Sequence, residues 1–257
     1  MKKRNFLLAV LLLLLAAPSF AARVDTLLVN SPSMNKDVQV VVVTPDAALG
    51  KKAVACPVIY LLHGYGGNAK TWIGVKPNLP QIADEKGIIF VCPDGKNSWY
   101  WDSPINPSYR YETYVSKELI NYIDSQYRTY NNRKGRAITG FSMGGHGALW
   151  LAFRHPDTYG ACGSISGGVD IRPFPENWEM KQLLGPYSEN PQRWNEYTVI
   201  NQLPYNSKSG PLAIIIDCGY YDFFYTVNQK LHEKLRYYNI PHDFLTRPGG
   251  HTHEYWN

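Results

Sequence analysis

The chain has 257 residues, of which 44% are hydrophobic and 18% are charged, proportions typical of ordinary globular proteins. They exclude a disordered chain, a collagen-like repeat and a long coiled coil, and the length favours a single domain. The formal net charge of +5 by itself suggests an anionic partner, but the distribution of the basic residues changes this interpretation.

The first 21 residues have the pattern of a secretory signal peptide. Basic residues at 2–4 precede an apolar run at 6–17, and Ser19 and Ala21 provide small residues for a cleavage site. A membrane anchor is the alternative, although the apolar run is short for a hydrocarbon core about 30 Å thick. We expect cleavage near Ala21 and a secreted or periplasmic protein with no stable membrane anchor. Cleavage removes three basic and no acidic side chains, which lowers the net charge from +5 to +2. This balance gives no reason to expect nucleic acid binding.

From residue 22 onwards, short apolar runs alternate with amphipathic stretches of helical length. The runs that predict strands lie at 38–43, 58–62, 88–92, 136–141, 160–165, 212–217 and 243–246. The stretches that predict helices lie at 112–127, 144–155 and 226–238, and a further helix is expected to end at 82–86. This alternation is typical of a parallel sheet covered by helices on both faces. We therefore expect one α/β domain over residues 22–257.

The segment 170–211 interrupts this alternation. It contains Trp178 and Trp194 and shows little periodicity. We expect a lid-like excursion over the carboxyl edge of the sheet, where α/β proteins bind their ligands. An ordinary surface loop with short helices is the alternative.

The four cysteines, Cys56, Cys92, Cys162 and Cys218, lie in or beside predicted strands. A cysteine in such a position usually behaves as a small apolar residue, so we expect buried free thiols. A disulfide is the alternative for an exported protein. The spacings contain no CxxC or Cys/His pattern, and the sequence indicates no metal site and no cofactor.

Residues 140–144, Gly-Phe-Ser-Met-Gly, fit the pattern G-x-S-x-G. A predicted strand precedes them, and a predicted helix rich in small residues follows. Serine in this pattern lies on a sharp turn, and the flanking glycines let the strand and the helix approach closely. Its hydroxyl is then raised above the sheet edge, beside the positive end of the helix. Ser142 is therefore the candidate nucleophile.

A serine nucleophile needs a base, and in hydrolases of this kind the acid and then the histidine follow the serine in the chain. His251 lies in a glycine-rich loop after the last predicted strand and is the preferred base, with His253 as the alternative. The acid must fix the tautomer of that histidine. Asp222 lies in the loop after the preceding strand and is preferred over Asp217, which still belongs to the strand, and over Asp170.

Two backbone N–H groups are expected to stabilise the negative charge that develops on the substrate oxygen. One belongs to Met143, the residue after the candidate nucleophile. The other is expected in the glycine-rich loop 61–67, where Tyr65 N–H is the preferred donor and Gly66 N–H the alternative. His63 is expected to brace this loop by hydrogen bonding, and together with Gly66 it is also a candidate substrate contact.

These motifs resemble the esterase D-like branch of the α/β-hydrolase superfamily, which includes feruloyl and acetyl-xylan esterases, S-formylglutathione hydrolases, tributyrin-type esterases and mycolyltransferases. The resemblance runs from about residue 38 to residue 256. Five motifs carry it in the family's order: LLHGYGG at 61–67, NSWY at 97–100, GFSMGGHGAL at 140–149, the stretch 217–222 and GGHTHEYW at 249–256. The resemblance implies an α/β-hydrolase fold with the nucleophile at Ser142, the acid at Asp222, the base at His251 and the oxyanion donors at Tyr65 and Met143.

The sequence departs from the family pattern in two places. Relatives usually continue after the last motif into a further C-terminal helix, whereas this chain stops at Asn257. Either the sequence is truncated here or this helix is missing, and a missing helix is expected to expose the apolar surface that it would cover. The second residue after the family's histidine is often aromatic, whereas here it is His253, which makes His253 a candidate substrate contact.

The resemblance predicts ester hydrolysis through a covalent acyl-enzyme. Export argues against a glutathione thioester and favours feruloyl or acetyl esters of plant polysaccharide. Trp99 and Trp101 belong to an aromatic segment that is expected to form a stacking wall for a phenolic acid or a sugar ring, unless its side chains pack the loops. A non-catalytic carbohydrate-binding protein and an acyltransferase to a sugar are the alternative functions. The sequence does not predict the oligomeric state.

Overall fold

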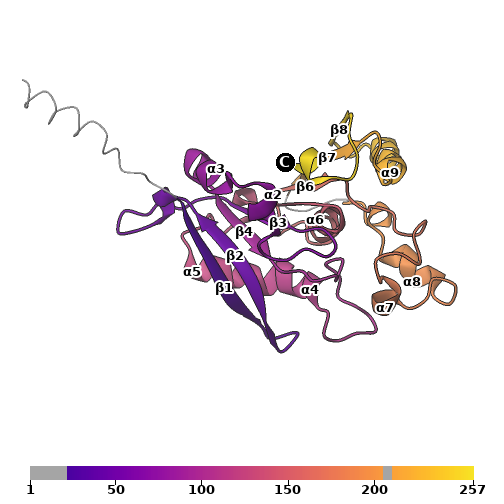
Figure 1. Cartoon of the computed structure of the whole chain (residues 1–257), viewed down its shortest axis with the longest axis horizontal. Helices are drawn as coiled ribbons and strands as arrows, with labels where there is room; N and C mark the ends of the chain where they lie inside the picture. The colour runs from indigo at the N-terminus through magenta and orange to yellow at the C-terminus, as the bar shows by residue number, and fades with distance from the viewer. Residues whose placement is uncertain (1–21, 205–209) are drawn as a thin grey trace, which may run out of the picture.

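The computed structural model describes residues 22–204 and 210–257, so the predicted signal peptide lies outside the described residues. The chain forms an eight-stranded sheet in the order β1-β2-β4-β3-β5-β6-β7-β8 (Figure 1). The strands are β1 (Arg23–Ser31), β2 (Lys36–Thr44), β3 (Val58–Leu62), β4 (Ile89–Pro93), β5 (Arg136–Phe141), β6 (Ala161–Ile165), β7 (Ala213–Gly219) and β8 (Asp243–Arg247). The β1–β2 and β2–β4 pairs are antiparallel, whereas the remaining pairs are parallel. The prediction of an α/β fold with a mostly parallel sheet is confirmed.

Helices flank this sheet and fill the connections between its strands. They are α2 (Thr71–Val75), α3 (Leu79–Lys86), α4 (Tyr111–Thr113), α5 (Leu119–Gln126), α6 (Met143–Arg154), α7 (Lys181–Leu184), α8 (Pro191–Glu196), α9 (Tyr225–Tyr237) and α10 (His253–Trp256). A π-helical stretch, Tyr114–Glu118, joins α4 to α5, and single 3-10 turns occupy Asp46–Ala48, Arg133–Gly135 and Val199–Asn201. None of the helices in the described ranges has the length and apolar character needed to cross a membrane.

Alternate side chains of the strands enter two separate cores, one on each face of the sheet. Tyr60 and Ile138 pack with residues of α5, α6 and α9 in the larger core. Leu61 and Phe141 pack with residues of α2 and α3 in the smaller core. The period of two along each strand therefore accounts for helices on both faces. All four cysteines are buried free thiols.

The smaller core does not extend over the whole sheet. Ile214 and Ile216 of β7 are buried in the larger core, so Ile215 between them faces the opposite side. Ile215 is 43% exposed, and Leu245 of β8 is 48% exposed.

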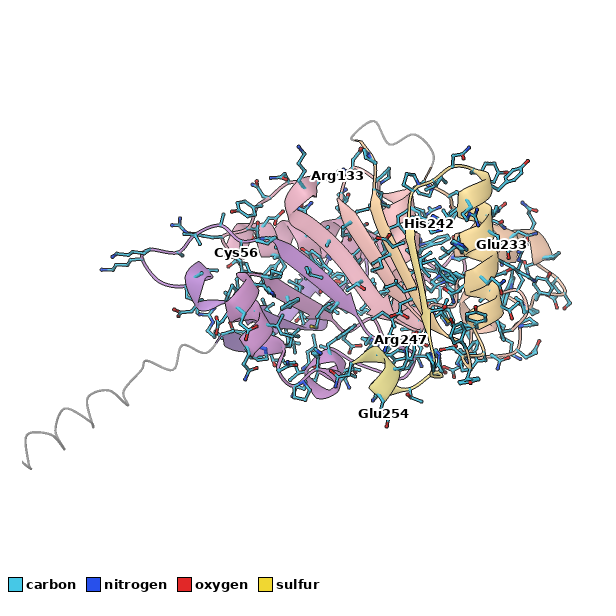
Figure 2. All side chains as sticks on the ribbon, turned by 90° about the horizontal axis from the view of Figure 1, so that it is seen from above. Cys56, Arg133, Glu233, His242, Arg247 and Glu254 are labelled. Carbon is cyan, nitrogen blue, oxygen red and sulfur yellow. The ribbon has the colours of Figure 1, made fainter. Side chains whose placement is uncertain are left out.

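The parallel strands end at one edge of the sheet. In Figure 2, Arg247 at the end of β8 and Glu254 of α10 lie at this edge, whereas Arg133 and His242, which precede β5 and β8, lie at the opposite edge. The loops that follow β3, β5, β7 and β8 leave the sheet at its carboxyl edge and carry the candidate site residues. The segment between β6 and β7, with α7 and α8, lies at one side of the sheet near α6 (Figure 1).

Candidate active site

Ser142 lies at the turn between β5 and α6, with a φ of 57° and a ψ of −122°. Such a positive φ is unfavourable for serine and marks a strained turn. A Cβ on Gly144 would lie 2.2 Å from the Leu62 carbonyl oxygen, and a Cβ on Gly140 would lie 2.5 Å from the Gly144 carbonyl carbon. Both glycines are therefore required for β3, β5 and α6 to meet behind the serine. The Ser142 N–H donates to the Ile165 carbonyl oxygen at 2.9 Å, which ties the turn to the end of β6.

A chain of hydrogen bonds connects Ser142 with the loops after β7 and β8. The distance from Ser142 Oγ to His251 Nε2 is 2.8 Å, and that from His251 Nδ1 to Asp222 Oδ2 is also 2.8 Å. Because the carboxylate accepts, Nδ1 carries the imidazole proton, and Nε2 is left to accept from the serine hydroxyl. The other carboxylate oxygen of Asp222 accepts from the Phe224 N–H at 2.8 Å. This arrangement prepares the imidazole to take a proton from Ser142.

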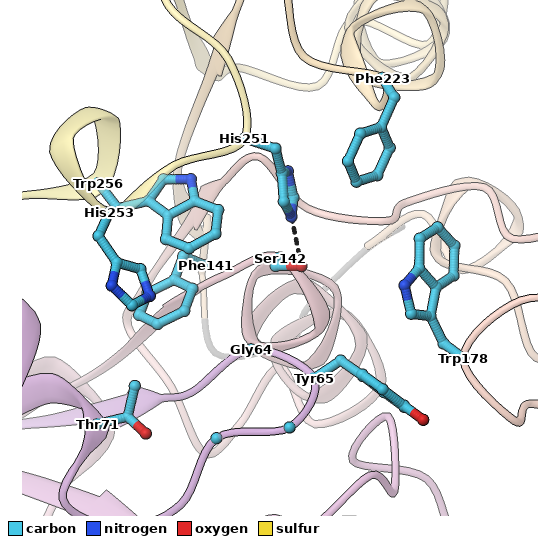
Figure 3. Close-up of a pocket in the computed structure, with 12 residues that line it drawn as sticks. Gly64, Tyr65, Thr71, Phe141, Ser142, Trp178, Phe223, His251, His253 and Trp256 are labelled. Atoms are coloured by element: carbon cyan, nitrogen blue, oxygen red, sulfur yellow. Dashed lines mark hydrogen bonds between the residues drawn. The ribbon is translucent and has the colours of Figure 1, made fainter.

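Aromatic rings hold the imidazole of His251 from two sides, as Figure 3 shows. Its centroid lies 4.3 Å from that of Phe223 and 4.7 Å from that of Trp256. The His251 side chain is 17% exposed, whereas the Asp222 side chain is fully buried. Burial removes competing water from the carboxylate, so its hydrogen bond to the imidazole is stronger than it would be at the surface.

The alternative acids and the alternative base occupy other positions. Asp217 accepts hydrogen bonds from the hydroxyl of Tyr255 and from Arg247. Asp170 forms an ion pair with a nearby arginine at 2.7 Å. The ring of His253 lies against Phe141 and Trp256 at the side of the pocket, so the structure places His251 rather than His253 on Ser142.

The loop after β3 presents its backbone to the serine. The Gly66 N–H donates to Asn97 Oδ1 at 2.9 Å, so this donor is already engaged. No hydrogen bond of the Tyr65 or Met143 N–H is formed within the described residues, which leaves both groups available to a substrate oxygen. Met143 is the first residue of α6, where the helix dipole adds a partial positive charge.

His63 braces this loop from beneath and is only 1% exposed. The Gly95 N–H donates to His63 Nε2 at 2.8 Å, so Nε2 carries no proton. The proton is therefore on Nδ1, which donates to the Gly64 carbonyl oxygen at 2.7 Å. His63 ties the loop after β3 to the loop after β4, and the expectation that it contacts substrate is wrong, because its ring is buried away from the pocket.

The serine opens into a pocket of about 420 Å³. The residues that line it are Gly64, Tyr65, Gly66, Gly67, Thr71, Phe141, Ser142, Trp178, Phe223, His251, His253 and Trp256. In Figure 3, Phe223 and Trp178 lie on one side of Ser142, and Phe141, His253 and Trp256 lie on the other. Gly66 and His253, two candidate substrate contacts, thus reach the pocket. No cluster of three or more potential metal-binding side chains occurs within the described ranges.

Trp99 and Trp101 are not at the pocket, and the expectation of a stacking wall formed by them is wrong. They are 1% and 0% exposed and stack on each other with centroids 5.7 Å apart. Both rings pack edge-on against the imidazole of His146 of α6, with ring centroids 5.1 and 5.2 Å apart. Trp99 and Tyr100 have positive φ angles of 55° and 59°, a left-handed turn that directs this aromatic segment into the core. The alternative, that these side chains pack the loops, describes them correctly.

His146 makes the stability of the fold depend on pH. Burial lowers its pKa from 6.5 to about 3, and this outweighs the hydrogen bond from Nδ1 to the Gly168 carbonyl oxygen. Below pH 6.5, His146 therefore binds a proton in the unfolded chain but stays neutral in the folded chain. The free energy of unfolding consequently falls as the pH decreases from 6.5 towards 3. A His146→Asn variant keeps a donor for Gly168 and is expected to show a slope smaller by up to about 1.4 kcal/mol per pH unit. Urea unfolding between pH 7 and 4 measures both slopes, and equal slopes would contradict a neutral His146.

Sequence reasoning missed four residues that shape the site. Trp178 and Phe223 form one wall of the pocket, Trp256 packs on the imidazole, and Asn97 holds the Gly66 N–H. The only sequence signals were that Asn97 and Trp256 lie in family motifs and that Phe223 follows the candidate acid. Trp178 carried no local signal, because its approach to the pocket depends on the path of the whole segment between β6 and β7.

Comparison with known proteins identifies the family. The family model named Esterase, described as "Putative esterase", matches residues 31–257. An esterase of Mycobacterium tuberculosis (strain CDC 1551 / Oshkosh) is 27% identical over 225 residues, which are 76% of this chain and 48% of that protein. The chain thus spans about half the length of this relative. The S-formylglutathione hydrolase of Rattus norvegicus is 29% identical over 203 residues, which are 70% of this chain and 69% of that protein.

Solved structures show the same architecture. A ferulic acid esterase superposes with a TM-score of 0.77 at 28% identity, covering 93% of this chain and 94% of that chain. A fluorophosphonate-binding serine hydrolase of Staphylococcus aureus superposes with a TM-score of 0.75 at 21% identity, covering 91% of this chain and 94% of that chain, a likeness of fold alone. The match over residues 31–257, together with the fold shared with the ferulic acid esterase at 28% identity, shows that the chain belongs to the esterase D-like family of α/β-hydrolases.

Proposed function

We propose that this protein is an exported serine carboxylesterase that hydrolyses feruloyl or acetyl esters of plant polysaccharide through an acyl-enzyme on Ser142. The observation that carries the proposal is the pair of 2.8 Å hydrogen bonds that link Ser142 to His251 and His251 to Asp222. The strained turn at Ser142 and the two available N–H groups beside it support the same chemistry. Export rests on the pattern of the first 21 residues alone.

In the proposed acylation, His251 Nε2 takes the hydroxyl proton while Ser142 Oγ attacks the ester carbonyl carbon. The carbonyl oxygen becomes negatively charged and accepts hydrogen bonds from the Tyr65 and Met143 N–H groups. When the carbonyl re-forms, the bond to the alcohol oxygen breaks, and the imidazolium returns its proton to the departing alcohol. Asp222 stabilises the imidazolium during this step.

Deacylation repeats the sequence with water. His251 removes a proton from water, the hydroxide adds to the acyl carbon, and the same two N–H groups hold the oxyanion. Collapse releases the carboxylic acid, and Ser142 Oγ regains its proton from His251. The imidazole thus acts once as base and once as acid in each half of the reaction.

The two sides of the pocket support a bulky ester with a planar acyl group. Trp178 and Phe223 stack with centroids 5.8 Å apart and an angle of 23° between their planes, and together they present an apolar wall beside Ser142. A phenolic ring can lie against this wall. The opposite side carries the polar groups of Thr71 and His253, which suit the hydroxyl groups of a sugar.

Hydrolysis of four substrates by the purified protein tests this proposal. We expect turnover of p-nitrophenyl acetate, and we expect kcat/KM for methyl ferulate or for acetylated xylan to exceed that for S-formylglutathione. The latter substrate is included because of the similarity to the rat hydrolase, which is 29% identical. A preference for S-formylglutathione would contradict the proposal that polysaccharide esters are the substrates. Transfer of the acyl group to added xylo-oligosaccharide would favour an acyltransferase. Sugar binding without turnover of any of these substrates would contradict the proposal that the protein is an enzyme.

A further inference from the structure

A hydrogen bond beside the pocket joins two segments that are distant in the chain. The Tyr65 hydroxyl, in the loop after β3, donates to Glu179 Oε2 at 2.9 Å, although the two residues are 114 positions apart. In Figure 3 the Tyr65 side chain extends from below Ser142 towards Trp178, the neighbour of Glu179. Burial, and then the hydrogen bond to Glu179, raise the pKa of the Tyr65 hydroxyl, in keeping with its role as the donor of this hydrogen bond.

The backbone that presents Glu179 is strained. Trp178 and Glu179 have consecutive positive φ angles of 50° and 56°, a conformation that costs energy in residues other than glycine. Such a turn persists only where surrounding contacts fix it. The ring of Trp178 packs 5.8 Å from Phe223 and 5.3 Å from Phe224 and supplies one such anchor. The hydrogen bond between Tyr65 and Glu179 supplies a second anchor, at the next residue of the turn.

The same hydrogen bond acts on the backbone of Tyr65. The next residue, Gly66, has a φ of 76°, and its N–H is held by Asn97 at 2.9 Å. The peptide that carries the Tyr65 N–H is held through its own carbonyl, Gly64 O, which accepts from His63 Nδ1 at 2.7 Å and from the Gly67 N–H at 3.0 Å. The hydrogen bond of the Tyr65 side chain adds an anchor on the other side of its N–H, at the Tyr65 Cα. A small rotation of this peptide would turn the N–H away from the substrate oxygen, and catalysis is sensitive to such displacements.

We propose that Glu179 is a positioning residue: by accepting the hydrogen bond of Tyr65 it fixes both the oxyanion-binding N–H and the Trp178 wall of the pocket. This pair of residues is called the Tyr65–Glu179 clasp below. The inference rests on the proposed function for its kinetic consequences, whereas its structural consequences are independent of the reaction. The clasp makes the segment between β6 and β7 a part of the active site.

The kinetic test uses p-nitrophenyl acetate, whose acetyl group is too small to need the Trp178 wall. Glu179→Ala and Tyr65→Phe are each expected to lower kcat by about three- to tenfold with little change in KM. The double variant is expected to lose no more than either single variant, because both remove the same bond. Glu179→Gln keeps an acceptor oxygen in the same strained turn and is expected to restore most of the activity. Additive losses, or a Glu179→Gln variant as slow as Glu179→Ala, would overturn the proposal.

Glu176→Ala is the matched control, because Glu176 is an exposed glutamate of the same segment that pairs with Lys181 at 2.8 Å. It is expected to keep wild-type kinetics. Amide hydrogen exchange provides a readout that does not depend on activity. Glu179→Ala, but not Glu176→Ala, is expected to accelerate exchange in the segments 64–67 and 176–181. If the wild-type protein hydrolysed no ester, the proposed function would fail, but the exchange measurement would still test the clasp. Unchanged exchange in Glu179→Ala would overturn the clasp.

Discussion

Replacing Ser142 with alanine is expected to lower kcat/KM for p-nitrophenyl acetate by at least about 10³-fold. Alanine removes the Oγ that forms the covalent bond to the acyl group, and no acyl-enzyme can then accumulate. The fold should remain, since alanine at a φ of 57° carries a strain similar to that of serine. Initial rates at several substrate concentrations measure the loss, and thermal unfolding checks the fold.

The control is Ser166→Ala. Ser166 is also a buried serine with a positive φ, 51°, and it follows β6 rather than β5. The hydrogen bonds of His251 go to Asp222 and Ser142 rather than to Ser166, so this variant is expected to keep most of the activity. A fluorophosphonate should label the wild-type protein at Ser142 alone, and mass spectrometry locates the adduct. A Ser142→Ala protein that still formed an acyl-enzyme would show that another residue is the nucleophile.

The strands buried on both faces could be predicted closely from the sequence. Val58–Leu62 and Arg136–Phe141 have the predicted boundaries. The first is a continuous apolar run, as is typical of a strand covered on both faces, and the second ends directly before the turn at Ser142. β1 was not predicted, since it is an edge strand whose residues mostly alternate between exposed and half-buried or buried positions and form no such run. α2, Thr71–Val75, was also missed, because five residues are too few to establish a helical period.

The candidate site divides in the same way into local and long-range parts. Ser142 lies in a motif whose turn geometry is fixed within five residues, and the chain order then leads to Asp222 and His251. Trp99 illustrates the limit of this reasoning. A loop tryptophan near the carboxyl edge of the sheet suggests a ligand contact, yet the left-handed backbone at Trp99 places the ring in the core. The contact between Tyr65 and Glu179 depends on how the loop after β3 and the segment between β6 and β7 are placed in space. Neither segment carries a sequence pattern that predicts it.

Asp222→Asn is expected to lower kcat by about 10³- to 10⁴-fold while leaving KM for small esters nearly unchanged. Asp222 accepts from the Phe224 N–H through one oxygen and from His251 Nδ1 through the other. Asparagine has a single acceptor oxygen. If that oxygen stays on the Phe224 N–H, the amide NH₂ faces His251 and requires Nδ1 to accept. The imidazole proton then moves to Nε2, which donates to Ser142 and can no longer remove its proton. The variant thus holds the imidazole in the wrong tautomer, which nitrogen-15 chemical shifts of His251 report directly.

Asp217→Asn is the matched comparison, because Asp217 is the other carboxylate that the sequence offered as the acid. Its partners are Tyr255 and Arg247 rather than His251, so this variant should keep its rate within about tenfold of the wild type. Loss of the packing around Tyr255 would appear as a lower melting temperature, whereas Asp222→Asn should change the rate far more than the melting temperature. A protein in which Asp217→Asn abolished turnover and Asp222→Asn did not would have its acid on β7, and the hydrogen bond between His251 and Asp222 would then have only a structural role.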